Sequence, residues 1–163
     1  MTTLTVWKFH TADGAEKVMA KLVELQKQEL IEIEDAAIVS WPQGRKKPKT
    51  RQAVDLATTG AIDGAFWGML FGFIFLMPIV GMVLGAALGS MSGSFSDYGI
   101  NDDFIKDVKE KVTEGTSALF LFTGKVTIDK VEAAFSADEK GELIQSNLSA
   151  EQEAKLKEHF GEE

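Results

Sequence analysis

The 163-residue sequence contains no cysteine, so it can form no disulfide framework, no thiolate zinc site and no cysteine nucleophile. This absence fits a reducing compartment. Basic residues are also in deficit, 17 against 25 acidic ones, and the net charge is −8. Because most non-specific affinity for nucleic acid comes from neutralised phosphates, we expect no nucleic-acid partner. Residues 1–30 lack the basic and apolar regions of a secretion signal, so we expect none.

Charged residues and histidine are missing from residues 64–96, a gap that an ordinary water-facing helix would not leave. Glycine recurs there at every fourth position, in two series separated by Met77 and Pro78. The glycines are Gly60, Gly64, Gly68, Gly72, Gly81, Gly85, Gly89 and Gly93. At 3.6 residues per turn, this spacing lines each series along one helix face, where backbones can approach closely. We predict a hairpin of two helices, 58–77 and 79–96, that pack or self-associate through these grooves.

The opposite faces of these helices carry large apolar side chains, which we expect to contact lipid or other protein. These residues are Phe66, Trp67, Leu70, Phe71, Phe73, Ile74, Phe75, Met82, Val83 and Leu84. Each arm is barely long enough to cross a bilayer, and the connection FLMPIV has no polar residue. We therefore favour a hairpin whose tip stays in an apolar medium, either re-entrant in one leaflet or buried in the core of an oligomer.

Both flanks of the apolar block alternate strand and helix patterns. Before the block we predict strands at 4–9 and 31–41, and a helix from Gly14 to Glu29 begun by Thr11 or Asp13. After it we predict a helix at 103–113 capped by Asn101 or Asp102, a strand at 117–122, a helix at 127–135, a strand at 142–148 and a helix at 149–160, where Ser149 and Gln152 have capping-box spacing.

Each flank thus contains one strand–helix–strand unit, which predicts an α+β, ferredoxin-like sheet of four strands with helices on one face. Alternatively, the halves pair only in an oligomer. The segments are a first βαβ half at 1–55, the glycine-zipper hairpin at 56–96, and a second half with a C-terminal amphipathic helix at 97–163. Since the hairpin is then an insertion, deleting residues 57–95 should leave a soluble domain.

A cluster of basic residues directly precedes the apolar block. Five of the seventeen positive charges lie within seven residues: Arg45, Lys46, Lys47, Lys49 and Arg51. They predict either contact with anionic lipid headgroups or a merely solvated loop. If the hairpin enters a bilayer, the cluster places both termini in the cytoplasm.

The remaining candidate residues indicate no catalytic, metal or phosphate-binding site. Asp63 lies between two zipper glycines and is either a functional group at membrane depth or an interfacial residue with a polar neighbour. His10 and His159 lack further ligands for a metal site. The glycines lack the Gly-Lys-Ser/Thr ending of a phosphate loop. We therefore expect no catalytic site, no metal and no cofactor.

The segments DYGINDDFIK, GTSALFL and KVTIDKV follow the glycine-spaced block. Together with it they resemble the bacterial domain-of-unknown-function family 1269, described as predicted membrane proteins, over nearly the whole chain. The resemblance implies a bacterial membrane-associated protein and brings no catalytic residues.

Three hypotheses follow. The leading one is a non-enzymatic, hairpin-anchored membrane protein that self-associates through its glycine faces and carries a cytoplasmic ferredoxin-like domain. The second is a soluble homo-oligomer whose hairpins form an apolar interior that sequesters lipid or another hydrophobic ligand. The third is a regulatory module that binds a small molecule on the sheet.

Overall fold

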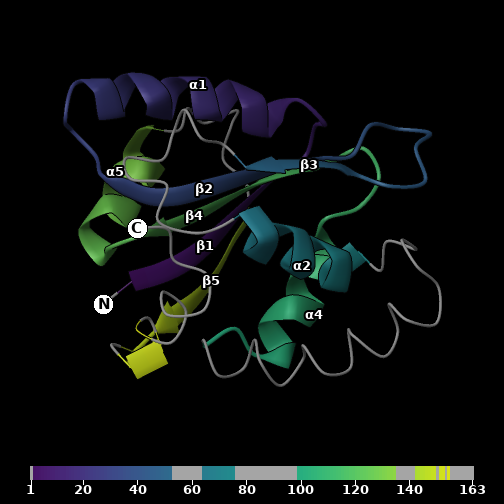
Figure 1. Ribbon diagram of the computed structural model, residues 1–163. Helices are drawn as coiled ribbons and strands as arrows, with labels where there is room; N and C mark the ends of the chain where they lie inside the picture. Colours follow the sequence, from purple (N-terminus) through teal and green to yellow (C-terminus); the bar gives the residue numbers. More distant parts are fainter. Residues whose placement is uncertain are drawn as a thin grey trace.

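Five strands form one antiparallel sheet, in the order β3-β2-β4-β1-β5 (Figure 1). This computed structural model describes residues 2–52, 64–75, 99–134, 142–149, 151–152 and 154. The strands are β1 (Thr2–Phe9), β2 (Ile33–Ser40), β3 (Lys49–Gln52), β4 (Ser117–Thr123) and β5 (Glu142–Leu148). The helices are α1 (Gly14–Lys27), α2 (Gly64–Phe75), α4 (Asp102–Lys111) and α5 (Lys125–Ala134). The α+β class predicted from the sequence is therefore confirmed.

Strand β4 lies at the centre of the sheet, between β2 and β1. All of its residues are buried, and its sequence SALFLFT carries apolar side chains on both faces. Phe120 pairs with Val6 of β1 on one side and with Ala37 of β2 on the other. Strands from the two predicted halves thus alternate within one sheet, so the halves pair inside a single chain.

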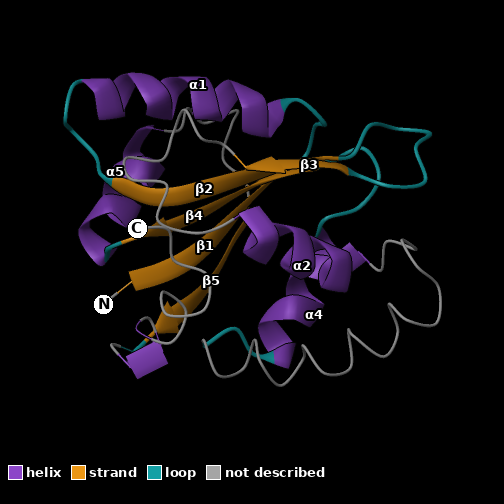
Figure 2. Cartoon of the chain, in the orientation of Figure 1, coloured by secondary structure: helices purple, strands orange, loops and turns teal. Residues whose placement is uncertain are grey.

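Helices cover both faces of the sheet (Figure 2). The core under α1 and α5 includes Trp7, Phe9, Val18, Leu22, Ile38, Leu119, Leu121 and Val131. The core under α2 and α4 includes Leu4, Val6, Val39, Trp67, Phe71, Phe104, Val108, Phe120 and Phe122. The prediction of four strands with helices on one face is wrong in both respects. A central strand that is apolar on both sides must be covered on both sides, because exposed apolar area is unfavourable in water.

Strand β3 was missed because two of its four residues are charged. Lys49 pairs with Ser40 and Arg51 with Ile38, so two residues of the basic cluster lie in a strand. An edge strand leaves one side open to water and tolerates charged residues there. The solvated-loop alternative for this cluster therefore does not hold for Lys49 and Arg51.

The start of α1 is held by a residue from a distant strand. Asp13 is the N-cap residue, but its side chain makes no capping hydrogen bond. Instead the Ala15 N–H donates to Ser117 Oγ at 2.9 Å, and this hydroxyl donates to the Thr11 carbonyl at 2.7 Å. Capping by Thr11 or Asp13 is thus replaced by a contact with the central strand β4.

The end of α1 also differs from the prediction. The helix ends at Lys27, before the expected Glu29, which has a φ of 60°. The Leu30 N–H donates to the Leu25 carbonyl at 3.0 Å. A left-handed residue followed by such a bond is the Schellman arrangement that closes helix C-termini.

Two other predicted helix starts are confirmed. Asn101 Oδ1 accepts from the Phe104 N–H at 2.9 Å. Ser149 Oγ accepts from the Gln152 N–H at 3.1 Å, while Gln152 Oε1 accepts from the Ser149 N–H at 2.9 Å. The second pair is a reciprocal capping box, as its sequence spacing predicted.

Candidate functional site

Helix α2 packs its aromatic face on the sheet of its own chain. Trp67, Leu70, Phe71 and Ile74 are each at most 3% exposed. The rings of Trp67 and Phe122 have centroids 5.4 Å apart. We expected these helix residues to face lipid or another protein, and for these four the expectation is wrong. Their cover is the apolar face of β1, β2 and β4.

A second aromatic contact, one helical turn after Trp67, also joins α2 to the central strand β4. Phe71 lies edge-on to Phe120, with centroids 5.0 Å apart. Trp67 also stacks on Phe71 at 5.8 Å. Offset and edge-to-face pairs of this kind add about 0.5–1.5 kcal/mol each beyond the burial of their area. The docking of α2 is therefore specific in geometry as well as apolar.

The glycines of α2 start at one edge of its docked face, where Gly64 is about 20° around the helix from Phe71, and drift away from that face toward Gly72. Gly64, Gly68 and Gly72 are roughly 60–140° around the helix from Trp67, at about 100° per residue. A Cβ added at Gly72 would meet no atom of the described residues within 4 Å. Gly72, which is buried, therefore lies on a side of α2 other than the one that packs on the sheet, whereas Gly64 borders the docked face. The other glycines of the series, Gly60, Gly81, Gly85, Gly89 and Gly93, lie outside the described residues.

The C-terminal end of α2 meets the loop that carries the basic cluster. Phe75 lies edge-on to Trp41, with ring centroids 5.9 Å apart. The Trp41 indole N–H donates to the Arg45 carbonyl at 2.9 Å. This Trp41 corner, made of Trp41, Phe75 and the loop that starts the basic cluster, joins segments that the sequence separates by more than thirty residues.

Backbone hydrogen bonds hold the Trp41 corner against the start of β4. The Trp41 N–H donates to the Thr116 carbonyl at 2.9 Å, and the Gly115 N–H donates back to the Trp41 carbonyl at 2.6 Å. The Gly44 N–H donates to the Glu114 carboxylate at 3.2 Å. Gly115 has a φ of +87°, a conformation that side chains rarely adopt. The corner is thus fixed on both sides of the loop.

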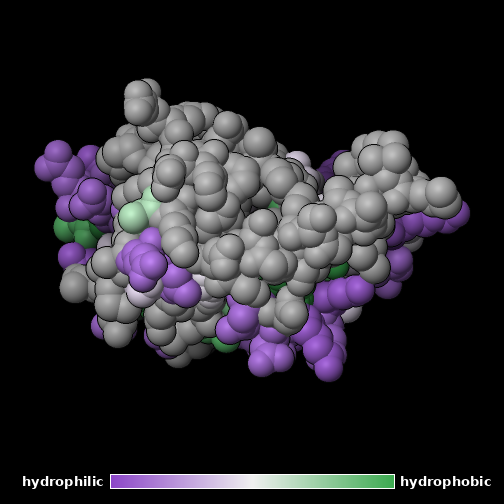
Figure 3. Space-filling view, turned by 60° about the horizontal axis from the view of Figure 1, so that its bottom comes forward, coloured by the Kyte–Doolittle hydropathy of each residue, from purple (hydrophilic) through white to green (hydrophobic). Residues whose placement is uncertain are grey.

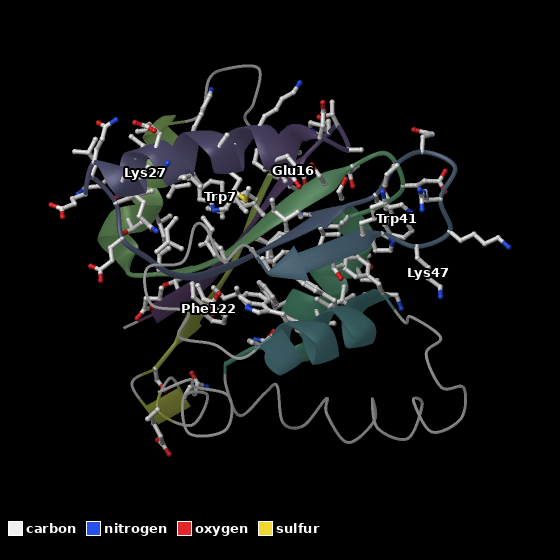
Figure 4. All side chains as sticks on the ribbon, turned by 45° about the horizontal axis from the view of Figure 1, so that its top comes forward. Trp7, Glu16, Lys27, Trp41, Lys47 and Phe122 are labelled. Atoms are coloured by element: carbon white, nitrogen blue, oxygen red, sulfur yellow. The ribbon has the colours of Figure 1, made fainter. Side chains whose placement is uncertain are left out.

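Four members of the basic cluster are exposed around this corner: Arg45, Lys46, Lys47 and Lys49. Within the described part of the chain, no ion pair involves these four. Figure 4 shows Trp41 and Lys47 at the same end of the molecule, with Lys47 directed away from the sheet and Lys27 at the opposite end. The side chain of Arg51 lies outside what the structure describes. Exposed cations beside an aromatic ring can bind anionic groups such as phosphates.

The other candidate residues form no site among the described residues. His10 is exposed, whereas Asp63 and His159 lie outside them. Over the described ranges, no three His, Asp or Glu side chains are grouped as metal ligands. The pKa of Asp13 is lowered, chiefly by a hydrogen bond from the Thr11 side chain and then by Lys17, whose ammonium lies 3.3 Å away. This exposed ion pair lies at the start of α1, and we assign it no functional role.

A cavity of about 460 Å³ opens between the end of α1 and α5. Its lining is mixed: Gln26, Glu29, Leu30, Ile31, Glu32, Thr127 and Lys130. The Gln26 amide oxygen accepts from the Ile33 N–H at 3.1 Å, and the Thr127 hydroxyl donates to the Glu32 carbonyl at 3.2 Å. Two of its polar groups are thus occupied in holding the fold together. A small molecule could bind in this cavity, as the third hypothesis requires, but its lining indicates no particular class of ligand.

A family model described as "Protein of unknown function (DUF1269)" matches residues 61–161. The chain belongs to the DUF1269 family. The match includes α2, α4, β4, α5 and β5 of this DUF1269 protein, and it begins before the docked helix. Comparisons with curated proteins and with solved structures give no match. None of the described helices is both long enough and apolar enough to cross a membrane.

Proposed function

We propose that this chain is a non-enzymatic membrane-associated protein that self-associates through its glycine-spaced helices. The observation that carries the proposal is the Trp41 corner, where the exposed cations stand beside the last residue of α2. From Phe75 the sequence continues to Ser96 without a charged residue. The basic cluster therefore lies beside the end of α2, from which the uncharged segment continues along the sequence.

The chemistry of this corner suits an anionic membrane surface. A basic residue near such a surface contributes about 1 kcal/mol of attraction. Tryptophan is enriched where headgroups meet hydrocarbon, because its ring is apolar and its N–H is polar. Should the apolar segment enter the bilayer, the basic cluster favours cytoplasmic termini, as predicted from the sequence.

We further infer that β2, β4, β1 and β5 constitute a ferredoxin-like sheet. Their order and antiparallel sense support this assignment, because two βαβ halves interleave in this way. On this interpretation β3, α2 and α4 are additions placed between the halves. The additions supply an edge strand and the second helical layer.

The alternative is a soluble homo-oligomer that sequesters lipid or another hydrophobic ligand in an apolar interior. One observation favours it: α2 already covers four of its large apolar side chains with protein. Helices of this composition can therefore be shielded from water without lipid.

Vesicle binding separates the two functions. The triple variant Arg45→Gln, Lys46→Gln, Lys47→Gln is expected to lose about 3 kcal/mol of attraction, or roughly 100-fold in affinity, for vesicles that contain phosphatidylserine. The measurement is co-flotation of the purified full chain with phosphatidylcholine vesicles, with and without phosphatidylserine, at two salt concentrations. Wild-type binding should weaken as salt increases.

The matched control removes the same charge elsewhere, through Lys21→Gln, Lys27→Gln and Lys130→Gln on exposed positions of α1 and α5. It should float like the wild type. If control and test variants lose binding equally, the effect is one of net charge. A wild-type protein that stays with the soluble fraction as a discrete large particle would favour the sequestering oligomer.

The glycine groove has its own test at Gly72. Gly72→Leu is expected to lower the oligomer fraction in mild detergent, because the larger side chain fills the groove. Gly72→Ala should keep or raise the melting temperature, since a methyl group there meets no atom of the described part of the chain within 4 Å and alanine favours helix by about 1 kcal/mol. An unchanged particle mass in Gly72→Leu would count against self-association through this face.

A further inference from the structure

The two edges of the sheet differ in how they are protected. Strand β3 has four residues, of which Lys49 and Arg51 are cations. Strand β5 has seven residues, with one charged residue at its start and no proline. Short length and charge are the means by which proteins prevent an edge from pairing with another strand. The β3 edge has both, whereas the β5 edge is longer and carries its single charge at one end.

Strand β5 is regular along its whole length. It pairs with β1 from Glu142, opposite Lys8, to Leu148, opposite Thr2, without a register shift. Its outer N–H and C=O groups therefore recur regularly along the edge, in the alternating pattern that a further antiparallel strand would need. Within the described ranges, no strand pairs with that outer side.

The charge and apolar surface of β5 also suit a partner. The Glu142 carboxylate lies 3.5 Å from the Lys111 ammonium of α4, so the charge of this strand is compensated within the chain. Leu143 is 38% exposed. In Figure 3 the coloured residues are mainly hydrophilic, with hydrophobic ones in small patches. Of the described large apolar residues, Leu30 and Leu143 are the exposed ones, and Leu143 lies on this edge.

We propose that the outer edge of β5 pairs antiparallel with β5 of a second copy of this chain, which continues the sheet across a two-fold axis. The register that uses the whole strand places the axis at Gln145. Glu142 then lies opposite Leu148 of the partner subunit, so no like charges meet. A two-fold contact of this kind is self-complementary and closes as a dimer. This inference is independent of the membrane proposal and of the glycine groove.

The absence of cysteine makes the register directly measurable. In the full chain, Gln145→Cys is expected to form a disulfide-linked dimer under mild oxidation, because directly opposite residues of an antiparallel pair have Cβ atoms about 4.5–5.5 Å apart. Leu143→Cys and Asn147→Cys alone should crosslink at least about tenfold less, since each then lies several residues from its own copy. A mixture of those two variants should crosslink with each other.

Equal crosslinking of the three single variants, or none at Gln145→Cys, would overturn the proposal. A Gln145→Cys chain that crosslinks to a different protein and not to itself would also overturn it. A second measurement uses Leu143→Lys, which places a cation on the edge and should lower the mass of the particle about twofold, because one contact between copies is lost. Leu30→Lys makes the same change at the other exposed leucine and should leave the mass unchanged.

Discussion

Deleting residues 57–95 is expected to unfold the remainder of the chain. The deletion removes α2, whose four buried side chains each contribute about 1.5–3 kcal/mol by burial. Their sum, about 6–12 kcal/mol, is comparable with the total stability of a typical domain, about 5–15 kcal/mol. The face formed by Leu4, Val6, Phe120 and Phe122 would also be left to water where α2 had covered it. This expectation reverses the one drawn from the sequence, in which the hairpin was a removable insertion.

The measurement is the solubility and far- and near-ultraviolet circular dichroism of the deleted chain. A matched deletion of residues 76–95 with a short Gly/Ser linker keeps α2 and should retain both the secondary structure and the aromatic signal. If the chain without 57–95 melts cooperatively at the temperature of the matched deletion, α2 is dispensable and the docking seen in the structure contributes little.

The strands and amphipathic helices were largely predictable because their patterns are local. The strand at 142–148 has the predicted bounds, and the central strand extends only to Thr123 beyond its predicted end at Phe122. Asn101 and Ser149 cap their helices through neighbours three residues away. In each case the residues that determine the structure lie within a few positions of one another.

The docking of α2 was not predictable in the same way. A helix with no polar residue has no polar face, so its sequence does not indicate which side will be buried or against what. The informative signal lay elsewhere, in SALFLFT, whose apolar residues on both faces require two layers of cover. Helices α1 and α5 pack on one face of the sheet, and α4 packs on the other. Helix α2 supplies the additional apolar side chains that bury this second face.

Long-range contacts account for the other errors and for the candidate site. The Ser117 hydroxyl reaches α1 across 102 positions of sequence, so no local rule predicts that cap. The basic cluster was recognised as a membrane-facing candidate from its composition, whereas the contact of Trp41 with Phe75 depends on the sheet that brings them together. Local patterns therefore identify the charged residues of the site but not its aromatic partner.

Trp67→Ala is expected to destabilise the folded chain by about 3–5 kcal/mol, the usual cost of truncating a buried tryptophan. The indole is 2% exposed and contacts Phe71, Phe120 and Phe122, with centroid distances of 5.8, 6.3 and 5.4 Å. Its removal opens a cavity between α2 and the sheet that neighbouring rings can fill only in part. The measurement is urea unfolding followed by circular dichroism, where the loss appears as a lower midpoint at unchanged slope.

Trp41→Ala is the matched control, because Trp41 is only partly buried and has one ring contact with α2, at Phe75. Its loss should be clearly smaller than that of Trp67→Ala, since less apolar area is exposed to water when it is truncated. Comparing the two variants then distinguishes the stability contributed by the docking of α2 from the stability contributed by the Trp41 corner. Equal losses for both variants would contradict the docked position of α2, whereas a large loss confined to Trp67→Ala identifies this helix as part of the folded core.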